Sequence, residues 1–150
     1  MTDLLYLYRL AEQDRIQVDC FDLRSREALS IMDPDGCCYI AIDPFQLRRE
    51  SDERQKLAHE LGHCETGSFY NRYAACDVRQ KHENRADKWA IKKLVPKDEL
   101  EAAVNAGHTE FWDLAELFSV TEDFMKKAVC WYRHGNLNVE ALFPAAPCPS

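Results

Sequence analysis

Residues 51–67 read SDERQKLAHELGHCETG, and this stretch predicts the α-helix around which the chain is organised. Ser51 can cap the start of the helix, acidic residues follow in its first turn, and Gly67 suits its end. An apolar stripe runs along one side of the helix and is formed by Leu57, Leu61 and Cys64. We therefore expect the helix to lie at the border of the hydrophobic core, where a cleft can open beside it.

The same helix carries His59-Glu60-Leu61-Gly62-His63, a pattern typical of metal-dependent hydrolysis. Side chains four residues apart lie on one helical face, about 5–6 Å apart at Cβ, so His59 and His63 can bind one metal ion. Zinc is the expected ion, with iron, manganese or cobalt as the alternatives. The carboxylate of Glu60 can accept a proton from water during attack on a carbonyl, without being a metal ligand. Gly62 either allows another backbone to approach closely or is simply tolerated in the helix.

Two histidines leave a catalytic zinc site one protein ligand short, and Glu83 is the candidate for the third. Glu83 and Asp87 are four residues apart and fall on the core-facing stripe of a second helix. Because an inward-facing carboxylate needs a partner, a metal ion accounts for Glu83, and a ligand histidine that donates its other ring N–H accounts for Asp87. Two alternatives stay open: both acids could favour the helix dipole in a first turn, and His82 could replace Glu83 as a ligand.

The rest of the chain predicts a small sheet followed by helices. A helix is expected over 3–13 and a strand over 16–23, and a β-hairpin is expected around the turn Asp33-Pro34-Asp35-Gly36, with Leu29 and Ile31 before it and Cys38, Ile40 and Ile42 after it. Further helices are expected over 82–95, 97–105, 110–118 and 121–133, and a flexible proline-rich tail over about 143–150. We predict an α+β fold, a single domain over 1–150, with a small antiparallel sheet of about three strands on a helical body.

The composition narrows the class of protein. The chain has 150 residues, of which 46% are hydrophobic, so it can form one sizeable core. Its formal net charge of −7 argues against general binding to nucleic acids or anionic membranes. No segment is apolar enough to span a bilayer and the N-terminus is acidic, so a cytoplasmic protein is expected. Seven cysteines without a C-x-x-C pair indicate reduced thiols, most of them small buried hydrophobes.

Taken together, these motifs resemble those of the ImmA/IrrE family of metallopeptidases. The resemblance covers about residues 40–133 and rests on three segments: His59-Glu-Leu-Gly-His63, Glu83-x-x-Ala86-Asp87-x-Trp89-Ala90, and Leu114-Ala115-x-x-Phe118-x-Val120. Trp89 stands where phenylalanine is commoner. The resemblance implies a zincin-like active-site helix in an intracellular zinc endopeptidase, often carried by phages or mobile elements. It also implies a protein substrate, a helix-turn-helix repressor that is cleaved to relieve repression.

Two other functions compete with this one. A non-catalytic anti-repressor would bind the same partner and use the metal only as a structural element. A DNA-binding regulator would use residues 110–133, which faintly resemble a helix-turn-helix with the basic residues Lys126, Lys127 and Arg133. Acidic residues surround these cations, so we expect a helical hairpin that closes the core, with no direct nucleic-acid binding.

Two expectations concern the substrate. Tyr70 and Tyr73 lie between the two motif helices, and either phenol could donate to the oxyanion that develops during hydrolysis. A bound segment is expected to be extended and to lie along the edge of the strand Cys37–Ile42, which leads into the active-site helix.

Overall fold

A computed structural model describes residues 2–71 and 73–142 of the chain, and in this part the fold is α+β. The helices are α1 (Leu4–Gln13), α2 (Glu50–Thr66), α3 (Cys76–Leu94), α4 (Lys97–Asn105), α5 (Phe111–Phe118), α6 (Glu122–His134) and α7 (Val139–Leu142), and the strands are β1 (Gln17–Cys20), β2 (Ala28–Met32) and β3 (Cys38–Ile42). The predicted small sheet on a helical body is therefore confirmed. The predicted tail, 143–150, lies outside the described residues.

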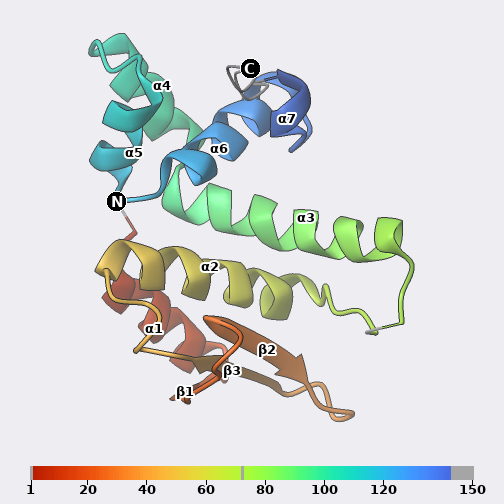
Figure 1. Cartoon of the computed structure of the whole chain (residues 1–150). Helices are drawn as coiled ribbons and strands as arrows, with labels where there is room; N and C mark the ends of the chain where they lie inside the picture. Colours follow the sequence, from red (N-terminus) through yellow and green to blue (C-terminus); the bar gives the residue numbers. More distant parts are fainter. Residues whose placement is uncertain (1, 72, 143–150) are drawn as a thin grey trace, which may run out of the picture.

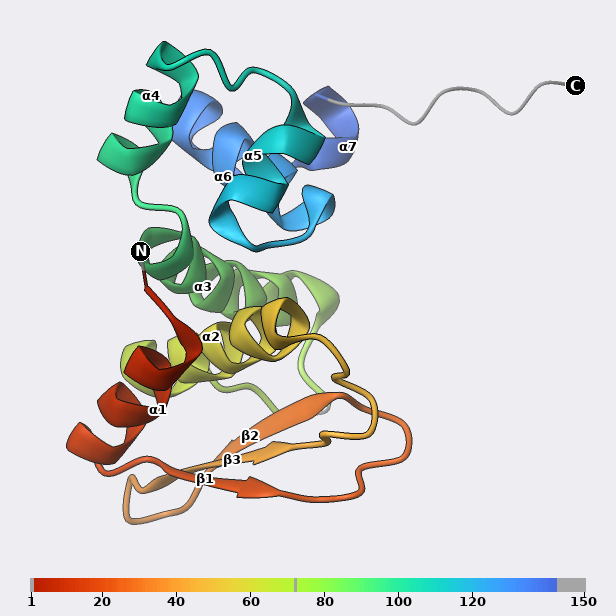
Figure 2. The same cartoon turned by 90° about the vertical axis from the view of Figure 1, so that its left-hand side faces the viewer.

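The elements lie in three layers, which Figures 1 and 2 show from two sides. The sheet and α1 form one layer, α2 and α3 lie side by side and antiparallel in the middle, and α4 to α7 form the third. Both α1 and the sheet pack against α2, and α6 packs against α3. The α2–α3 pair is consequently the centre of the molecule.

The sheet has the strand order β1-β3-β2, so β3 is its central strand. The hairpin between β2 and β3 is antiparallel, as predicted, and Gly36 in its turn adopts φ +84°. The prediction of a wholly antiparallel sheet is wrong, because β1 pairs in parallel with β3. The reason is burial: β3 buries Cys38, Ile40 and Ile42 on one face and therefore takes the place between the two less buried strands.

The pairing register decides which side chains of β2 face α2. Ser30 lies opposite Ile40, a buried residue of the core, whereas Leu29 and Ile31 lie opposite Ala41 and Tyr39. Because side chains alternate along a strand, Ser30 points to the core side and Leu29 and Ile31 point away from it. The sheet thus presents a hydroxyl group, rather than an apolar side chain, to the helix that carries the paired-histidine motif.

The two central helices differ from prediction at their starts. Helix α2 begins at Glu50, with Arg49 at the N-cap, so Ser51 lies inside the helix and is not its cap. Gly67 ends the helix in the left-handed conformation, as expected. Helix α3 begins at Cys76, six residues before the predicted start at 82. Its first turns are exposed and polar, so they carry no apolar periodicity from which a helix could be predicted.

The C-terminal helices agree with prediction over α4, α5 and α6, and α7 was not predicted. Helices α5 and α6 pack together as the expected helical hairpin, around buried Phe118 and Phe124. Trp112 of α5 does not join this packing and is 58% exposed. No helix in the described part of the chain has the length and apolar character needed to cross a membrane. The expectation that most cysteines are buried is wrong, because only Cys38 and Cys130 of the six cysteines in the described residues are buried.

Candidate metal centre

Helix α2 places its motif residues at the boundary between the core and a cleft. Leu57 and Leu61 are fully buried and fix the rotation of the helix. That rotation leaves Glu60 9% exposed, His63 6% exposed and His59 partly buried. The two histidines contact Glu83 of α3, and Glu60 contacts Ser30 of β2. The motif therefore lies neither on an open surface nor deep in the core.

Gly62 lets α3 approach this helix closely. A Cβ atom added at Gly62 would lie 2.5 Å from the carbonyl oxygen and 2.9 Å from the Cα of Ala86. Contacts that short do not occur with backbone atoms, so only glycine fits at this position. Of the two readings that the sequence left open, the structure supports the close approach. Because Ala86 is three residues after Glu83, the contact also holds Glu83 against the histidines.

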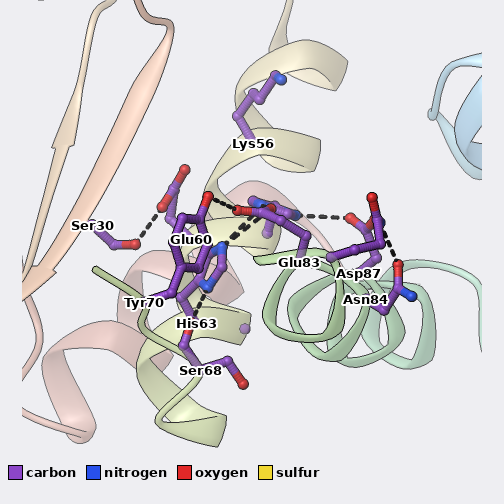
Figure 3. Close-up of polar contacts among 12 residues, drawn as sticks. Ser30, Lys56, Glu60, His63, Ser68, Tyr70, Glu83, Asn84 and Asp87 are labelled. Carbon is purple, nitrogen blue, oxygen red and sulfur yellow. Dashed lines mark hydrogen bonds and ion pairs between the residues drawn. The ribbon is translucent and has the colours of Figure 1, made fainter. Parts of the chain in front are cut away.

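Three side chains converge at this point (Figure 3). Glu83 Oε2 lies 2.9 Å from His59 Nε2 and 3.4 Å from His63 Nε2. The two Nε2 atoms are 3.2 Å apart. The donor atoms of His59, His63 and Glu83 all lie within 4.8 Å of one another. Two imidazole nitrogens and one carboxylate oxygen around a common point form a donor set that suits a divalent cation such as zinc.

The remaining ring nitrogens are occupied by protein groups. His59 Nδ1 lies 2.8 Å from Asp87 Oδ1, and His63 Nδ1 lies 2.5 Å from the carbonyl oxygen of Ser68. These acceptors favour a proton on each Nδ1 and leave each Nε2 lone pair directed at the cluster. The structure thus brings Asp87 to the position predicted for it, and it adds Ser68, which the sequence did not indicate.

The charges at the cluster also suit a cation. Burial opposes protonation of His59, but hydrogen bonds with Asp87 and Glu83 outweigh it and raise the pKa of His59 to about 9. Hydrogen bonds with His59 and then His63 hold the pKa of Glu83 far below its usual value. Glu83 and Asp87 therefore stay ionised, and their negative charge favours a cation at the site. A divalent cation would supply that charge and would displace the ring proton from Nε2.

Glu60 lies beside this cluster and is not one of its donors. Its Oε2 atom accepts a hydrogen bond from the Ser30 hydroxyl of β2, a contact that the sequence did not predict. The contact holds the carboxylate at the cleft next to the histidines. No sequence pattern links a serine in a strand to a glutamate thirty residues later, so only the strand register reveals this partner.

A cavity of about 370 Å³ opens directly onto these groups. It is lined by His59, Glu60, His63 and Glu83 from the helices, by Ala28, Leu29, Ser30 and Ile31 from β2, and by Arg26, Ser68, Phe69, Tyr70 and Arg79. The strand beside the cleft is therefore β2. The prediction that a substrate would lie along the edge of Cys37–Ile42 is wrong, because β3 is paired on both sides.

The other candidates from the sequence lie in different places. Tyr70 lines the cavity and its hydroxyl donates to Glu83 Oε1 at 2.7 Å. Tyr73 is 79% exposed and is not among the described residues that line the cavity. His82 is not part of the donor cluster; its ring lies beside that of Tyr70, with centroids 6.1 Å apart. The alternative that Glu83 and Asp87 occupy a first helical turn is wrong, since α3 begins at Cys76.

Comparison with known families gives the class of protein that this fold and cluster suggest. The IrrE N-terminal-like domain, a peptidase family, matches residues 46–129, and the chain belongs to this family. The match includes both helices of the cluster and most of α6. Comparisons with curated proteins and with solved structures gave no match.

Proposed function

We propose that this protein is a zinc-dependent endopeptidase of the cytoplasm in which His59, His63 and Glu83 hold the metal and Glu60 is the general base. One observation carries the proposal: Glu60 lies at the cleft beside the donor cluster without belonging to it. A purely structural metal site has no use for a free carboxylate at this position and is normally closed by four protein ligands. Membership of a peptidase family supports the same reading.

In the proposed hydrolysis of a peptide bond, the residues of the site have different roles. A divalent ion bound by the cluster supplies Lewis-acid polarisation of a carbonyl oxygen and of water. The Glu60 carboxylate takes a proton from the water whose oxygen attacks the peptide carbon. The same carboxyl group then gives this proton to the amide nitrogen as the C–N bond breaks. Ser30 donates to Glu60 Oε2, so we assign the proton transfer to the other carboxylate oxygen. The Tyr70 hydroxyl, which donates to Glu83 Oε1 in this structure, turns to donate a hydrogen bond to the developing oxyanion.

The cleft suits an extended peptide that lies along β2. One edge of this strand pairs with β3, and among the described residues no strand pairs with its other edge. Main-chain groups on an unpaired edge can bind a peptide as one more strand, and β2 lines the same cavity as Glu60. A peptide bound in this way would have its scissile bond next to the donor cluster of His59, His63 and Glu83. That the substrate is a helix-turn-helix repressor rests on the resemblance to ImmA/IrrE peptidases rather than on the cleft.

The test compares wild type with Glu60→Gln, which keeps the size of the side chain and removes the base. Cleavage of a helix-turn-helix repressor supplied as the substrate should fall by at least about 10²-fold, while zinc content and thermal melting stay unchanged. Glu65→Gln is the matched control, because it makes the same change on the exposed side of the same helix. It should cleave as wild type does.

Two outcomes contradict the proposal in different ways. If Glu60→Gln relieves repression in cells as well as wild type does, the protein acts by sequestering its partner. If Glu60→Gln loses zinc, Glu60 is itself a ligand and the proposed donor set is wrong.

A further inference from the structure

Asp87 contacts two partners from two different helices. Its Oδ1 atom lies 2.8 Å from His59 Nδ1, and its Oδ2 atom lies 3.1 Å from Lys127 Nζ. Lys127 belongs to α6, in the layer beyond α3, and does not line the cavity that holds Glu60. A cation from the C-terminal helical hairpin is thus one side chain away from a histidine of the donor cluster.

The surroundings of this ion pair distinguish it from an ordinary surface pair. Exposed pairs contribute little to stability, because water screens both charges. Here the Asp87 side chain is only 13% exposed, whereas that of Lys127 is 42% exposed. One carboxylate oxygen is already used by His59, so without Lys127 the second oxygen would have no hydrogen-bond donor among the described residues. An almost buried carboxylate oxygen without a donor is unfavourable, and the side chain would rotate to find one.

Helix α6 also fixes where the ammonium group can lie. Phe124, Met125 and Ala128, on either side of Lys127 in the sequence, are buried in the core. Asp123, four residues earlier on α6, lines the same cavity as Lys127 and Asp87 and is an acid that could compete for the ammonium group. Lys127 Nζ nevertheless lies 3.1 Å from Asp87 Oδ2 and donates a hydrogen bond to it. The hairpin therefore places a cation at Oδ2 of Asp87, the carboxylate oxygen that His59 does not contact.

We propose that Lys127 is a positioning residue for the metal centre. Its ammonium group holds Asp87 in the orientation in which Oδ1 accepts from His59 Nδ1, and this contact aims His59 Nε2 at the donor cluster. The inference rests on the proposed metal site, but not on the peptidase activity. It gives the α5–α6 hairpin a role at the centre although the hairpin does not enter the catalytic cleft.

Removal of Lys127 should change the metal affinity in opposite directions, depending on whether Lys127 acts by positioning Asp87 or only through its charge. A cation near a metal site repels a metal ion, so removal of Lys127 should strengthen metal binding if charge alone matters. If Lys127 positions Asp87, its removal should weaken metal binding. Loss of an outer hydrogen-bond partner of a metal ligand typically costs about 10–100-fold in affinity. Because Lys127 acts through Asp87, we expect about tenfold, the lower end of that range.

The experiment measures the zinc affinity of the full chain by competition with a chromophoric chelator. Lys127→Met should bind zinc about tenfold more weakly than wild type, and Lys127→Arg should recover most of the loss because it keeps a cationic donor. Lys126→Met is the matched control, since Lys126 lies over the Phe111 ring, 5.8 Å from its centroid, and should bind as wild type does. Thermal melting of the metal-free variants shows whether a loss of fold contributes.

The same Lys127 substitution is also tested in a variant that already lacks the Asp87 carboxylate. In Asp87→Asn, the further change Lys127→Met should have no additional effect, because the two residues act as one unit. The proposal is overturned if Lys127→Met leaves zinc affinity unchanged or raises it, if Lys126→Met has an equal effect, or if the effects of the two changes simply add. If wild type itself cannot be loaded with zinc, both this inference and the proposed metal site are wrong. Weakened binding without peptidase activity would leave this inference standing and remove the proposed function.

Discussion

His59 and His63 each use one ring nitrogen for a protein partner and keep the other for the cluster. Asp87 holds the first ring and the Ser68 carbonyl holds the second, so two different kinds of acceptor give the same orientation. An imidazole without such a partner could rotate or change its tautomer. The precision of the cluster therefore depends on residues that would not themselves touch a metal ion.

The two loop tyrosines give a matched pair of variants at the scale of single residues. Tyr70→Phe should lower turnover by about 10²-fold, the scale for losing one oxyanion donor, with zinc content and KM little changed. Tyr73→Phe should leave turnover as in wild type, because Tyr73 is 79% exposed and lies outside the lining of the cleft. Steady-state kinetics on one peptide substrate measures both. Equal rates in the two variants would show that Tyr70 only supports Glu83.

The residues of the cluster could be predicted from the sequence, but several of their partners could not. Helical spacing alone places His59 with His63 and Glu83 with Asp87. Ser30, Ser68 and Lys127 carry no such signal, because each acts from a strand, a loop or a distant helix. Their roles depend on which elements meet in space, and no local pattern contains that information.

At the scale of elements, the approach of α2 to α3 depends on the absence of a single methyl group. Gly62 meets the backbone of Ala86, so the helices lie closer than any side chain at this position would allow. The acids of α3 reach the histidines of α2 because of this distance. The sequence predicted which faces of the two helices are apolar, but not how closely the helices approach.

Gly62→Ala tests this contact by the sign of its effect on stability. In an exposed helix, alanine would stabilise relative to glycine by about 1 kcal/mol. Against the Ala86 backbone, we expect a loss of about 1–3 kcal/mol in the free energy of unfolding, together with weaker zinc binding. Gly107→Ala is the control: it is strained because φ is +107°, but it lies in the connection after α4 and should leave zinc affinity intact. A more stable Gly62→Ala protein would contradict the close contact.

The order of the strands in the sheet could not be predicted from the alternation of apolar residues along the sequence. Alternation predicted the hairpin and its turn, since both depend on neighbours in the sequence. It did not predict that β3 lies between β1 and β2, which depends on the relative burial of three strands. The start of α3 was missed for a related reason: its first turns extend beyond the packed body and carry no apolar stripe.

At the scale of the whole molecule, Arg54 joins three parts of the chain. This residue of α2 is 3% exposed; its guanidinium donates to the Thr2 carbonyl at 2.6 Å and to the carbonyls of Phe118 and Ser119 at 2.7 and 2.9 Å. Ser119 ends α5 with φ +54°, so its carbonyl group is not available to a continuing helix. A single side chain thus connects the N-terminus, the central layer and the C-terminal hairpin.

Arg54→Met should lower the free energy of unfolding by about 2–4 kcal/mol, because several hydrogen bonds to a charged donor are lost and the carbonyl acceptors stay buried. Urea unfolding followed by circular dichroism measures the change. Arg9→Met, at an exposed arginine of α1, is the control and should unfold at nearly the wild-type midpoint. Equal midpoints for the two variants would show that the three parts are held together by apolar packing alone.

The central position of β3 has a consequence for synthesis on the ribosome. Both edge strands, β1 and β2, are made before the strand that pairs with them. At roughly 5–20 residues per second, the segment from Cys20 to Ile42 takes on the order of seconds to appear. During that interval β1 has no partner, and α1 is too short to be stable alone. The nascent segment up to β3 must therefore stay unfolded until Ile42 has emerged, and the helix with the paired histidines follows directly behind it.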